Sequence, residues 1–243
     1  MQIDEFVALT QKRRSIRKFQ PNPVPPEYIE KILESARWTM SGGNSQPWQF
    51  IVIQKQEIKA KLAEIYSSYR ELSLSVELTR LEEYRQPAFR PTGAHGGVET
   101  VRSNFTVWSS APVIIAVLGD HRLMQASTLA ARLFEMHTFD QDLACVAYNI
   151  HLAATALGLG AQWLSLLPPA ADAMKAVLAI PLELTLFNLN PIGYPAIEPL
   201  SHRRSLSELV HYDAYDMANF MSNNAVQEFI RSHRERRVKQ GKD

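Results

Sequence analysis

The stretch DQDLACVAYNIHLAATALGLG, residues 140–160, carries the clearest structural pattern in this 243-residue chain. Its apolar residues recur at the spacing of an α-helix, and Gly158 and Gly160 follow where such a helix ends. One helical face carries Leu143, Val146, Ala147, Ile150, Ala154 and Leu157. Because few polar residues interrupt this pattern, we expect the helix to lie centrally, covered by other elements. Cys145, the only cysteine, falls within it, and we expect a small core residue there and not a nucleophile.

Helical and extended patterns are mixed on both sides of this helix. Short apolar runs predict strands at residues 49–53, 111–119, 161–167 and 182–195. Amphipathic spacing predicts helices over residues 29–36, after two prolines, and over residues 58–69 and 170–178. This mixture along the chain favours an α+β or an α/β fold.

We expect a single domain over residues 1–243. The composition, 46% hydrophobic and 21% charged, is that of an ordinary globular protein. Two parts are expected outside the core: residues 78–108, an excursion long enough to be a lid, and residues 213–243, a C-terminal extension with many cations near its end. No apolar run suits a membrane span and no signal-peptide pattern is present, so we expect a cytoplasmic protein.

A local cluster of cations, RRSIRKF at residues 13–19, predicts an anion site. The overall charge does not explain the cluster, since 26 Lys and Arg against 25 Asp and Glu leave a net charge of +1. Ser15 offers a hydroxyl, Ile16 and Phe19 indicate that part of the segment packs inward, and guanidinium groups bind phosphate through paired hydrogen bonds. A solvated charged turn is the alternative. A small phosphorylated ligand is a better candidate than nucleic acid, because no second basic stripe or aromatic platform accompanies the cluster.

The loop SGGNSQPWQF, residues 41–50, has the composition of a ligand-binding turn. Gly42 and Gly43 let the backbone approach a ligand closely, and Asn44 and Gln46 offer amide donors and acceptors. Such a loop suits a flat heteroaromatic ring; an ordinary turn with Trp48 as a core anchor is the alternative. Neither a dinucleotide-binding nor a Walker glycine motif is present.

The seven histidines do not predict a metal site. They form no H-E-x-x-H motif and no closely spaced pair, and the acidic residues around His137 lack a ligand spacing. His95, flanked by glycines in the possible lid, could reach a ligand, although an exposed histidine is the simpler expectation. No local signature of a Ser-His-Asp or Cys-His arrangement is present either.

Five motifs together resemble the nitroreductase family of FMN-dependent NAD(P)H oxidoreductases. They are, in chain order, RRSIRKF, GGNSQPWQFIVI, AATALGLGAQWLS, LNPIGYP and HRRSLSELV, and they lie between residues 10 and 212. The resemblance implies an α+β fold with a central, mostly antiparallel sheet flanked by helices. It also implies an intertwined homodimer with two FMN molecules at the subunit interface, in which the C-terminal extension packs on the partner; a solvated basic end is the alternative for that extension.

The resemblance also assigns residues to the flavin. The residues that would bind the phosphate and the pyrimidine side of the ring are Arg13, Arg14, Ser15 and Arg17, helped by Arg203 or Arg204. From the other subunit, the residues that would frame the flavin are Ser41, Gly42 and Asn44, with Gln46 in the same loop. The residues that would lie against the isoalloxazine are Trp163, Leu164 and Ser165.

The chemistry that this family resemblance implies belongs to the flavin and not to a catalytic side chain. Hydride would pass from NAD(P)H to flavin N5, and the reduced ring would then reduce a nitroaromatic, a quinone or a related acceptor in a ping-pong reaction. Arg14 or Arg17 near the N1 edge would stabilise the negative charge of the reduced ring.

The chain departs from the family pattern at two places. Thr39-Met40-Ser41-Gly42 stands where many members have Pro-Ser-Ser or Ala-Pro-Ser, and WLSL replaces a common Pro-x-Glu-Gly, so no proton donor near N5 is identified. GAQWLSLL is similar to the Gly-Trp-Val-Ser segment of the flavin-destructase branch, which makes dimethylbenzimidazole. The alternatives to a nitroreductase are therefore a relative of that kind, a reductive dehalogenase, or a non-enzymatic flavin-binding protein.

Overall fold

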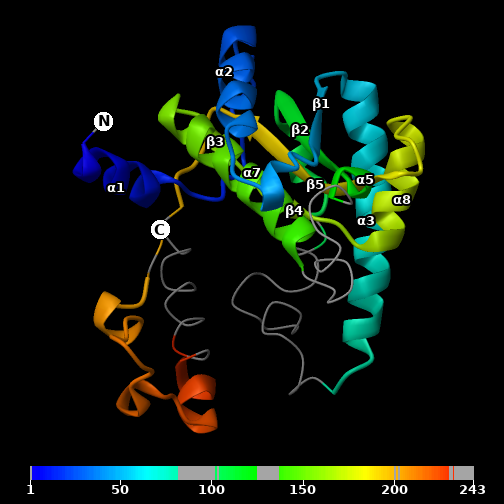
Figure 1. Ribbon diagram of the computed structural model, residues 1–243. Coiled ribbons are helices and arrows are strands. Elements are labelled where there is room, and N and C mark those ends of the chain that lie inside the picture. Colours follow the sequence, from blue (N-terminus) through cyan, green and yellow to red (C-terminus); the bar gives the residue numbers. More distant parts are fainter. Residues whose placement is uncertain are drawn as a thin grey trace.

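An antiparallel sheet of five strands forms the centre of the part of the chain that the structure describes (Figure 1). The computed structural model describes residues 2–81, 102, 104–124, 137–199, 201, 203–229 and 232. The strands β1 (Trp48–Ile53), β2 (Val113–Asp120), β5 (Leu184–Gly193) and β3 (Gly160–Ala161) follow one another across the sheet, and β4 (Leu164–Ser165) pairs with β5 beside β3. The predicted α+β class and the mostly antiparallel sheet are confirmed.

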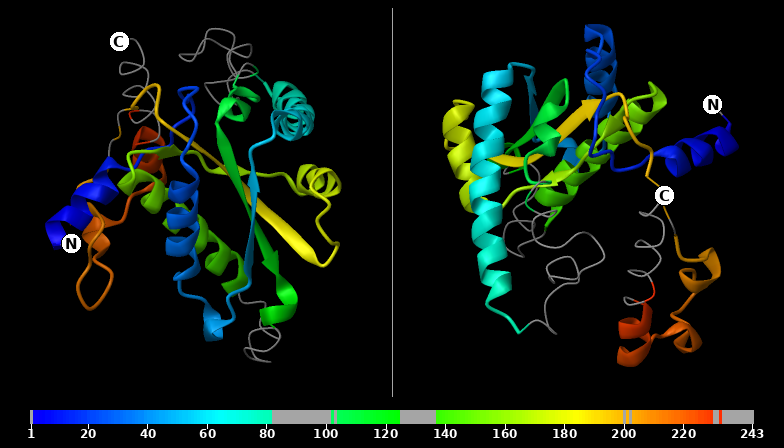
Figure 2. Two further views of the ribbon diagram at one scale, coloured as in Figure 1. Left: turned by 90° about the horizontal axis from the view of Figure 1, so that it is seen from above. Right: turned by 180° about the vertical axis from the view of Figure 1, so that it is seen from behind.

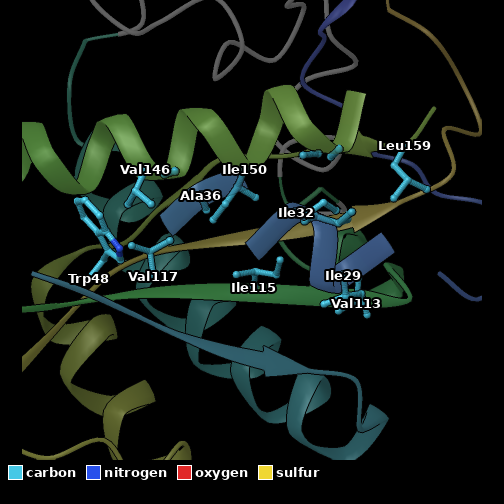
Figure 3. Close-up of a cluster of buried hydrophobic side chains, with 14 of the residues drawn as sticks. Ile29, Ile32, Ala36, Trp48, Val113, Ile115, Val117, Val146, Ile150 and Leu159 are labelled. Carbon is cyan, nitrogen blue, oxygen red and sulfur yellow. The ribbon is translucent and has the colours of Figure 1, made fainter. Parts of the chain in front are cut away.

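Helices cover both faces of this sheet (Figure 2). On one face lie α2 (Pro26–Arg37) and α7 (Thr138–Ala156), and on the other lie α3 (Gln56–Leu78) and α8 (Pro168–Val177). The central strand β2 packs against both layers, since Val113, Ile115 and Val117 belong to the α7 side and Ile114, Ala116 and Leu118 to the α3 side. Figure 3 shows Ile115 and Val117 facing Val146 and Ile150 of α7. Burial on two faces explains why β2 reads as a continuous apolar run.

The predicted central helix is α7, and it ends where the glycines indicated. Gly158 has φ 74°, and Leu159 N–H donates to the carbonyl of Ala154 at 2.9 Å, as in a Schellman motif. The predicted apolar face is buried apart from Leu157, which is partly buried. Cys145, expected to be a small core residue, is half-buried. It lies on the face of α7 opposite to the one that packs in the core.

The strand predicted at residues 161–167 is interrupted. Ala161 pairs with Ile192 and Leu164 pairs with Leu189, but the ladder is broken between them. Gln162 N–H still donates to the carbonyl of Pro191 at 3.0 Å, whereas Pro191 has no N–H to return the bond. A single proline in β5 therefore divides the predicted strand into β3 and β4.

The remaining elements of the described residues are helical, and all but α1 are short. They are α1 (Ile3–Lys12), η1 (Gly42–Asn44), η4 (Val107–Ser110), α5 (His121–Met124), η5 (Leu206–Glu208) and η6 (Met217–Asn219). Most of the predicted lid, including His95, and the basic end of the chain lie outside the described residues. Within the described ranges, no helix has the length and apolar character that crossing a membrane requires.

Candidate functional site

The basic segment predicted to bind an anion runs along the edge of the sheet. Ser15 and Ala161 form a parallel bridge, and Ile16 N–H donates to the carbonyl of Ala161 at 3.0 Å. Ile16 is buried, as predicted, and lies so close to β3 that a Cβ on Gly160 would be 2.2 Å from its Cγ1. The segment is therefore fixed to β3 by its backbone and by Ile16, while Arg13 and Ser15 remain half-buried.

The arginines of this segment take different positions. Arg13 is half-buried and Arg17 is exposed. The guanidinium of Arg14 donates to the carbonyls of Gln11 and Arg13, the latter at 2.9 Å. Because Gln11 lies in the last turn of α1, this cation compensates the partial negative charge at the helix end. The structure thus gives the side chain of Arg14 a local role in ending α1.

A small pocket lies beside Arg14, between the end of α1 and the last turn of α7. It is lined by Lys12, Arg14, Ile16, Thr155, Gly158, Leu159, Gly160, Pro195 and Glu198. Its volume of about 50 Å³ is far below the roughly 300–1,000 Å³ of small-molecule sites. This pocket of a single chain is therefore too small to enclose a flavin.

The loop of residues 41–46 has an unusual backbone conformation. Gly43, Asn44 and Gln46 have φ values of 58°, 52° and 47°. At a residue other than glycine this left-handed conformation costs about 1–3 kcal/mol and persists only where its surroundings hold it. Ser41 Oγ accepts a hydrogen bond from Gln46 N–H at 2.9 Å. The side chains of Asn44 and Gln46 are exposed, so both predicted amides are accessible to a ligand.

A buried carboxylate holds this loop against α7. Both oxygens of Asp142 accept from Gly42 N–H, at 3.1 and 3.2 Å, and the residue is 6% exposed. Burial raises the pKa of Asp142 because its charged form loses hydration, and the bond from Gly42 only partly opposes this rise. Sequence reasoning missed Asp142, whose only signal was a carboxylate in an apolar helix.

The central helix α7 separates the loop from the basic segment within one chain. The loop is bonded to Asp142 near the start of α7, whereas Thr155, near its end, lines the pocket beside the basic segment. The rise from Asp142 to Thr155 along an α-helix is about 20 Å. The two groups of predicted flavin contacts therefore lie at opposite ends of this helix in a single chain.

Trp163 and Ser165 lie on the face of the sheet that carries α7. The indole Nε1 of Trp163 donates to Ser165 Oγ at 3.2 Å, and its ring packs edge-on against Phe187 with centroids 5.8 Å apart. Leu164 points to the other face, where it is 2% exposed in the cluster beneath α3 and α8. Only the backbone of Leu164 can therefore contact a ligand on the Trp163 side.

A buried polar network behind Trp163 was not predicted. Its members, His151 on α7 and Asn188 and Asn190 on β5, are 3%, 0% and 0% exposed. His151 Nε2 lies 3.0 Å from Asn190 Oδ1, and Asn190 Nδ2 donates to the carbonyl of Ile115 at 3.1 Å. The two asparagine amides also exchange hydrogen bonds, at 3.2 and 3.0 Å. The only sign of this network in the sequence is that each of the three positions has a polar residue within an otherwise apolar element.

Burial keeps His151 uncharged at neutral pH. Burial lowers the pKa of His151 to about 4, against the opposing effect of the hydrogen bond with Asn190. The positive charge of Arg13 lowers it further. A cation of the predicted anion site and a neutral buried imidazole therefore lie near one another.

The two C-terminal arginines lie in an arm formed by residues 203–229, here called the C-terminal arm, which extends away from the sheet (Figures 1 and 2). Arg204 donates to Glu208 Oε2 and to its carbonyl, each at 3.1 Å, and stacks on the ring of Phe229. Arg203 is exposed and donates to Ser201 Oγ at 2.5 Å. Arg204 thus stabilises the arm itself, while the phosphate contact predicted for one of the two stays a prediction.

The donor set of the site fits an organic anion better than a metal ion. Arg13, Ser15 and Arg17 lie within one short segment and offer cations and a hydroxyl, whereas the described residues contain no group of three or more His, Cys, Asp or Glu side chains placed to bind a metal. The residues present therefore suit the phosphate of a nucleotide-like cofactor.

Comparisons with known proteins show which family and which fold this chain resembles. The model of the Nitroreductase family matches residues 10–194. A "Putative NADH dehydrogenase/NAD(P)H nitroreductase" of Methanothermobacter thermautotrophicus is 30% identical over 189 residues, covering 77% of this chain and 75% of that protein. The 5,6-dimethylbenzimidazole synthase of Rhodospirillum rubrum is 30% identical over 196 residues, covering 80% and 84%. The structure of an FMN-dependent nitroreductase from Clostridium difficile shares the fold, with a TM-score of 0.60 over 86% of this chain and 99% of that one at 21% identity.

Proposed function

Because the chain belongs to the nitroreductase family, we propose that it is an FMN-dependent oxidoreductase that uses NAD(P)H to reduce a nitroaromatic, a quinone or a related small acceptor. The observation that carries this proposal is the basic segment fixed along β3. Its backbone bond to Ala161 brings Arg13 and Ser15 to the same edge of the sheet as Trp163 and Ser165. A phosphate site and a surface for a flat ring would then be adjacent.

We propose further that the working unit is a homodimer. Within one chain, α7 keeps the loop of residues 41–46 about 20 Å from the region of Thr155, so a flavin held by both needs the loop of a second copy. The C-terminal arm supports this assembly, because it extends from the core with Tyr212 85% and Phe220 62% exposed. Burial of such aromatic side chains against a partner would stabilise the dimer.

Each residue of the site has a proposed task. Arg13 and Ser15 would bind the phosphate, with Arg203 as the candidate from the arm. Arg14 or Arg17 would lie near the pyrimidine edge, with the guanidinium of Arg14 also bonding the end of α1. Asn44 and Gln46 of the partner would hydrogen-bond the ring.

The substrate side of the site would be shaped by Trp163 and Ser165, whose side chains share one face of the sheet. Bound FMN would supply the hydride-accepting atom, a chemistry that no amino-acid side chain provides. The cations of the basic segment would stabilise negative charge on the ring in a partly dry environment, where such interactions are stronger than in water.

The proposal is tested by FMN binding and turnover. We expect the purified protein to be yellow and to oxidise NAD(P)H when a quinone or nitroaromatic is added. Replacing Arg13 and Arg17 together by Ala is expected to weaken FMN binding by several kcal/mol, since charge-assisted hydrogen bonds contribute about 1.5–3 kcal/mol each.

The matched control for this double variant replaces Lys55 and Lys61 by Ala, which removes the same charge from two exposed positions of the α3 region. We expect it to retain normal affinity. Unchanged FMN affinity in the arginine variant, or a wild-type protein that neither binds FMN nor oxidises NAD(P)H, would contradict the proposal.

A flavin-consuming activity is the second candidate. The 30% identity to a 5,6-dimethylbenzimidazole synthase, together with a Trp163-x-Ser165 segment, favours it over a reductive dehalogenase or a non-enzymatic flavin-binding protein. The two candidates differ in what happens after reduction under oxygen: a nitroreductase returns intact FMN, whereas this activity breaks the flavin down to dimethylbenzimidazole. Chromatography of the reaction products separates them.

A further inference from the structure

The interruption between β3 and β4 leaves Trp163 with incomplete backbone support. The register on either side places Trp163 across from Asn190. The neighbouring residue of β5, Pro191, cannot donate a hydrogen bond to the carbonyl of Gln162. The ladder alone therefore does not fix this part of the chain, and side chains must contribute.

The side chains that gather behind the interruption form the His151, Asn188 and Asn190 network. Its hydrogen-bond directions are determined by the carbonyl of Ile115, which can only accept. Asn190 Nδ2 must face this carbonyl, so Asn190 Oδ1 faces His151, and His151 Nε2 must carry the proton that bonds it. One arrangement of donors and acceptors is thus consistent with all four of these hydrogen bonds, and the bond between His151 and Asn190 joins α7 to β5.

The network also adjoins the two side chains proposed to lie against the flavin. Asn188 is the register partner of Ser165, and residues directly opposite on one face have Cβ atoms about 4.5–5.5 Å apart. The His151 ring lies 6.1 Å from the Trp163 ring, centroid to centroid. Trp163 Nε1 in turn bonds Ser165 Oγ at 3.2 Å. Every member of the polar group therefore contacts, or lies across from, the Trp163–Ser165 segment.

We propose that His151, Asn188 and Asn190 are positioning residues of the cofactor site, which fix Trp163 and Ser165 against β5 and through them the position of the flavin ring. This inference rests on the proposed function. Burying three polar side chains in an apolar layer is costly unless every hydrogen bond is made, and the stability it returns is small. A network that holds one geometry accounts for their presence at the interruption.

The test compares three variants of the full-length protein. His151→Leu removes the donor to Asn190, whereas His151→Gln keeps an amide N–H of similar reach and should restore the bond. Ile150→Val is the matched control, because Ile150 directly precedes His151 on α7, is fully buried, and contributes packing only. For each variant, FMN affinity, the visible spectrum and reduction potential of the bound flavin, and the melting temperature are measured.

We expect His151→Leu to raise the Kd for FMN about tenfold, equivalent to about 1.4 kcal/mol, and to shift the spectrum and the potential. His151→Gln should return these readouts toward wild type, and Ile150→Val should lower the melting temperature alone. If His151→Leu does not fold, Asn188→Ser, a smaller change, should show the same pattern in weaker form.

The inference is overturned if His151→Leu or Asn188→Ser lowers the melting temperature but leaves affinity, spectrum and potential at their wild-type values. That result would make the network a purely structural feature, with the proposed function intact. A wild-type protein that does not bind FMN would instead contradict the proposed function itself, and this inference with it.

Discussion

His151 carries a pH dependence of stability that its burial makes predictable. Burial holds its pKa at about 4 in the folded protein, against 6.5 when exposed. Below about pH 6.5 the unfolded chain binds a proton that the folded chain does not, so stability is complete above that pH and falls as the pH drops toward 4. The loss reaches about 3 kcal/mol, since each pKa unit corresponds to about 1.36 kcal/mol.

Urea unfolding at several pH values between about 7 and about 4.5 measures this contribution. Because glutamine does not titrate, we expect His151→Gln to lose less stability than the wild type over this range. The difference between the two proteins should be most of the loss of about 3 kcal/mol expected for His151. If the free energy of unfolding changed with pH equally in the two proteins, folding would not lower the pKa of His151.

Asp142 allows a second test at the level of one residue. Asp142→Asn keeps an acceptor for Gly42 N–H and removes a buried charge, so at neutral pH we expect a free energy of unfolding equal to or above that of wild type. Asp142→Ala leaves the Gly42 N–H without its acceptor, at a cost of about 1–3 kcal/mol. The control is Asp140→Asn, an exposed neighbour. Equal stability of the Ala and Asn variants, measured by urea unfolding, would contradict the role of this bond.

Among the elements, the pairing of the basic segment with β3 depends on the absence of a side chain at Gly160. A Cβ there would lie 2.2 Å from Ile16 Cγ1 and 2.7 Å from Ile16 Cβ, and the branched Ile16 is buried and cannot easily move. We expect Gly160→Ala to displace the segment, to lower stability by about 1–3 kcal/mol and to weaken FMN binding. Thermal unfolding and FMN titration measure both effects.

Combining Gly160→Ala with Ile16→Ala removes Ile16 Cγ1, the atom nearest to the added Cβ, and leaves only the contact with Ile16 Cβ. We expect the double variant to be more stable than the sum of the two single free-energy changes predicts, because the effects of substitutions at two residues in contact are not additive. Strict additivity would show that the close approach of Ile16 to Gly160 does not determine the position of the segment.

The elements that follow from local periodicity were predictable, and those that depend on a distant residue were not. The face of α7 and the buried β2 could be predicted because each is visible within ten to twenty residues of sequence. The division between β3 and β4 depends on Pro191, whose position opposite Gln162 is known only once the register is known. The bond between Gly42 and Asp142 likewise joins residues 100 positions apart.

The candidate site shows the same division. The segment RRSIRKF and the loop of residues 41–46 were identified from residue types alone. That Arg14 bonds the end of α1, and that the side chain of Leu164 belongs to the opposite face, depends on local geometry that a motif does not contain. The network of His151, Asn188 and Asn190 was missed because His151 is far in sequence from the two asparagines, and the three side chains meet only when α7 packs on β5.

At the scale of the whole molecule, a shared site predicts complementation between copies. A protein carrying Arg13→Ala and Arg17→Ala, and another carrying Asn44→Ala and Gln46→Ala, should each bind FMN poorly. In a twofold dimer that takes the loop from one copy and the basic segment from the other, a mixed dimer has one site with both defects and one intact site.

Equal amounts of the two variants, unfolded together and refolded, should therefore recover about a quarter of the wild-type FMN sites, since about half of the dimers formed at random are mixed. Each variant refolded alone is the control. No recovery in the mixture, in the presence of dimers by light scattering, would mean that each chain builds its site from its own residues.

Pro191 also affects how the sheet ends. Because its carbonyl faces Gln162, its missing N–H faces the same side, and β5 presents an incomplete row of donors along that margin. A foreign strand that displaced the two short strands there could not form hydrogen bonds along the full length of β5, and such recruitment is a common first step in aggregation. The proline that divides one strand into two thus also makes this margin a poor template for fibril growth.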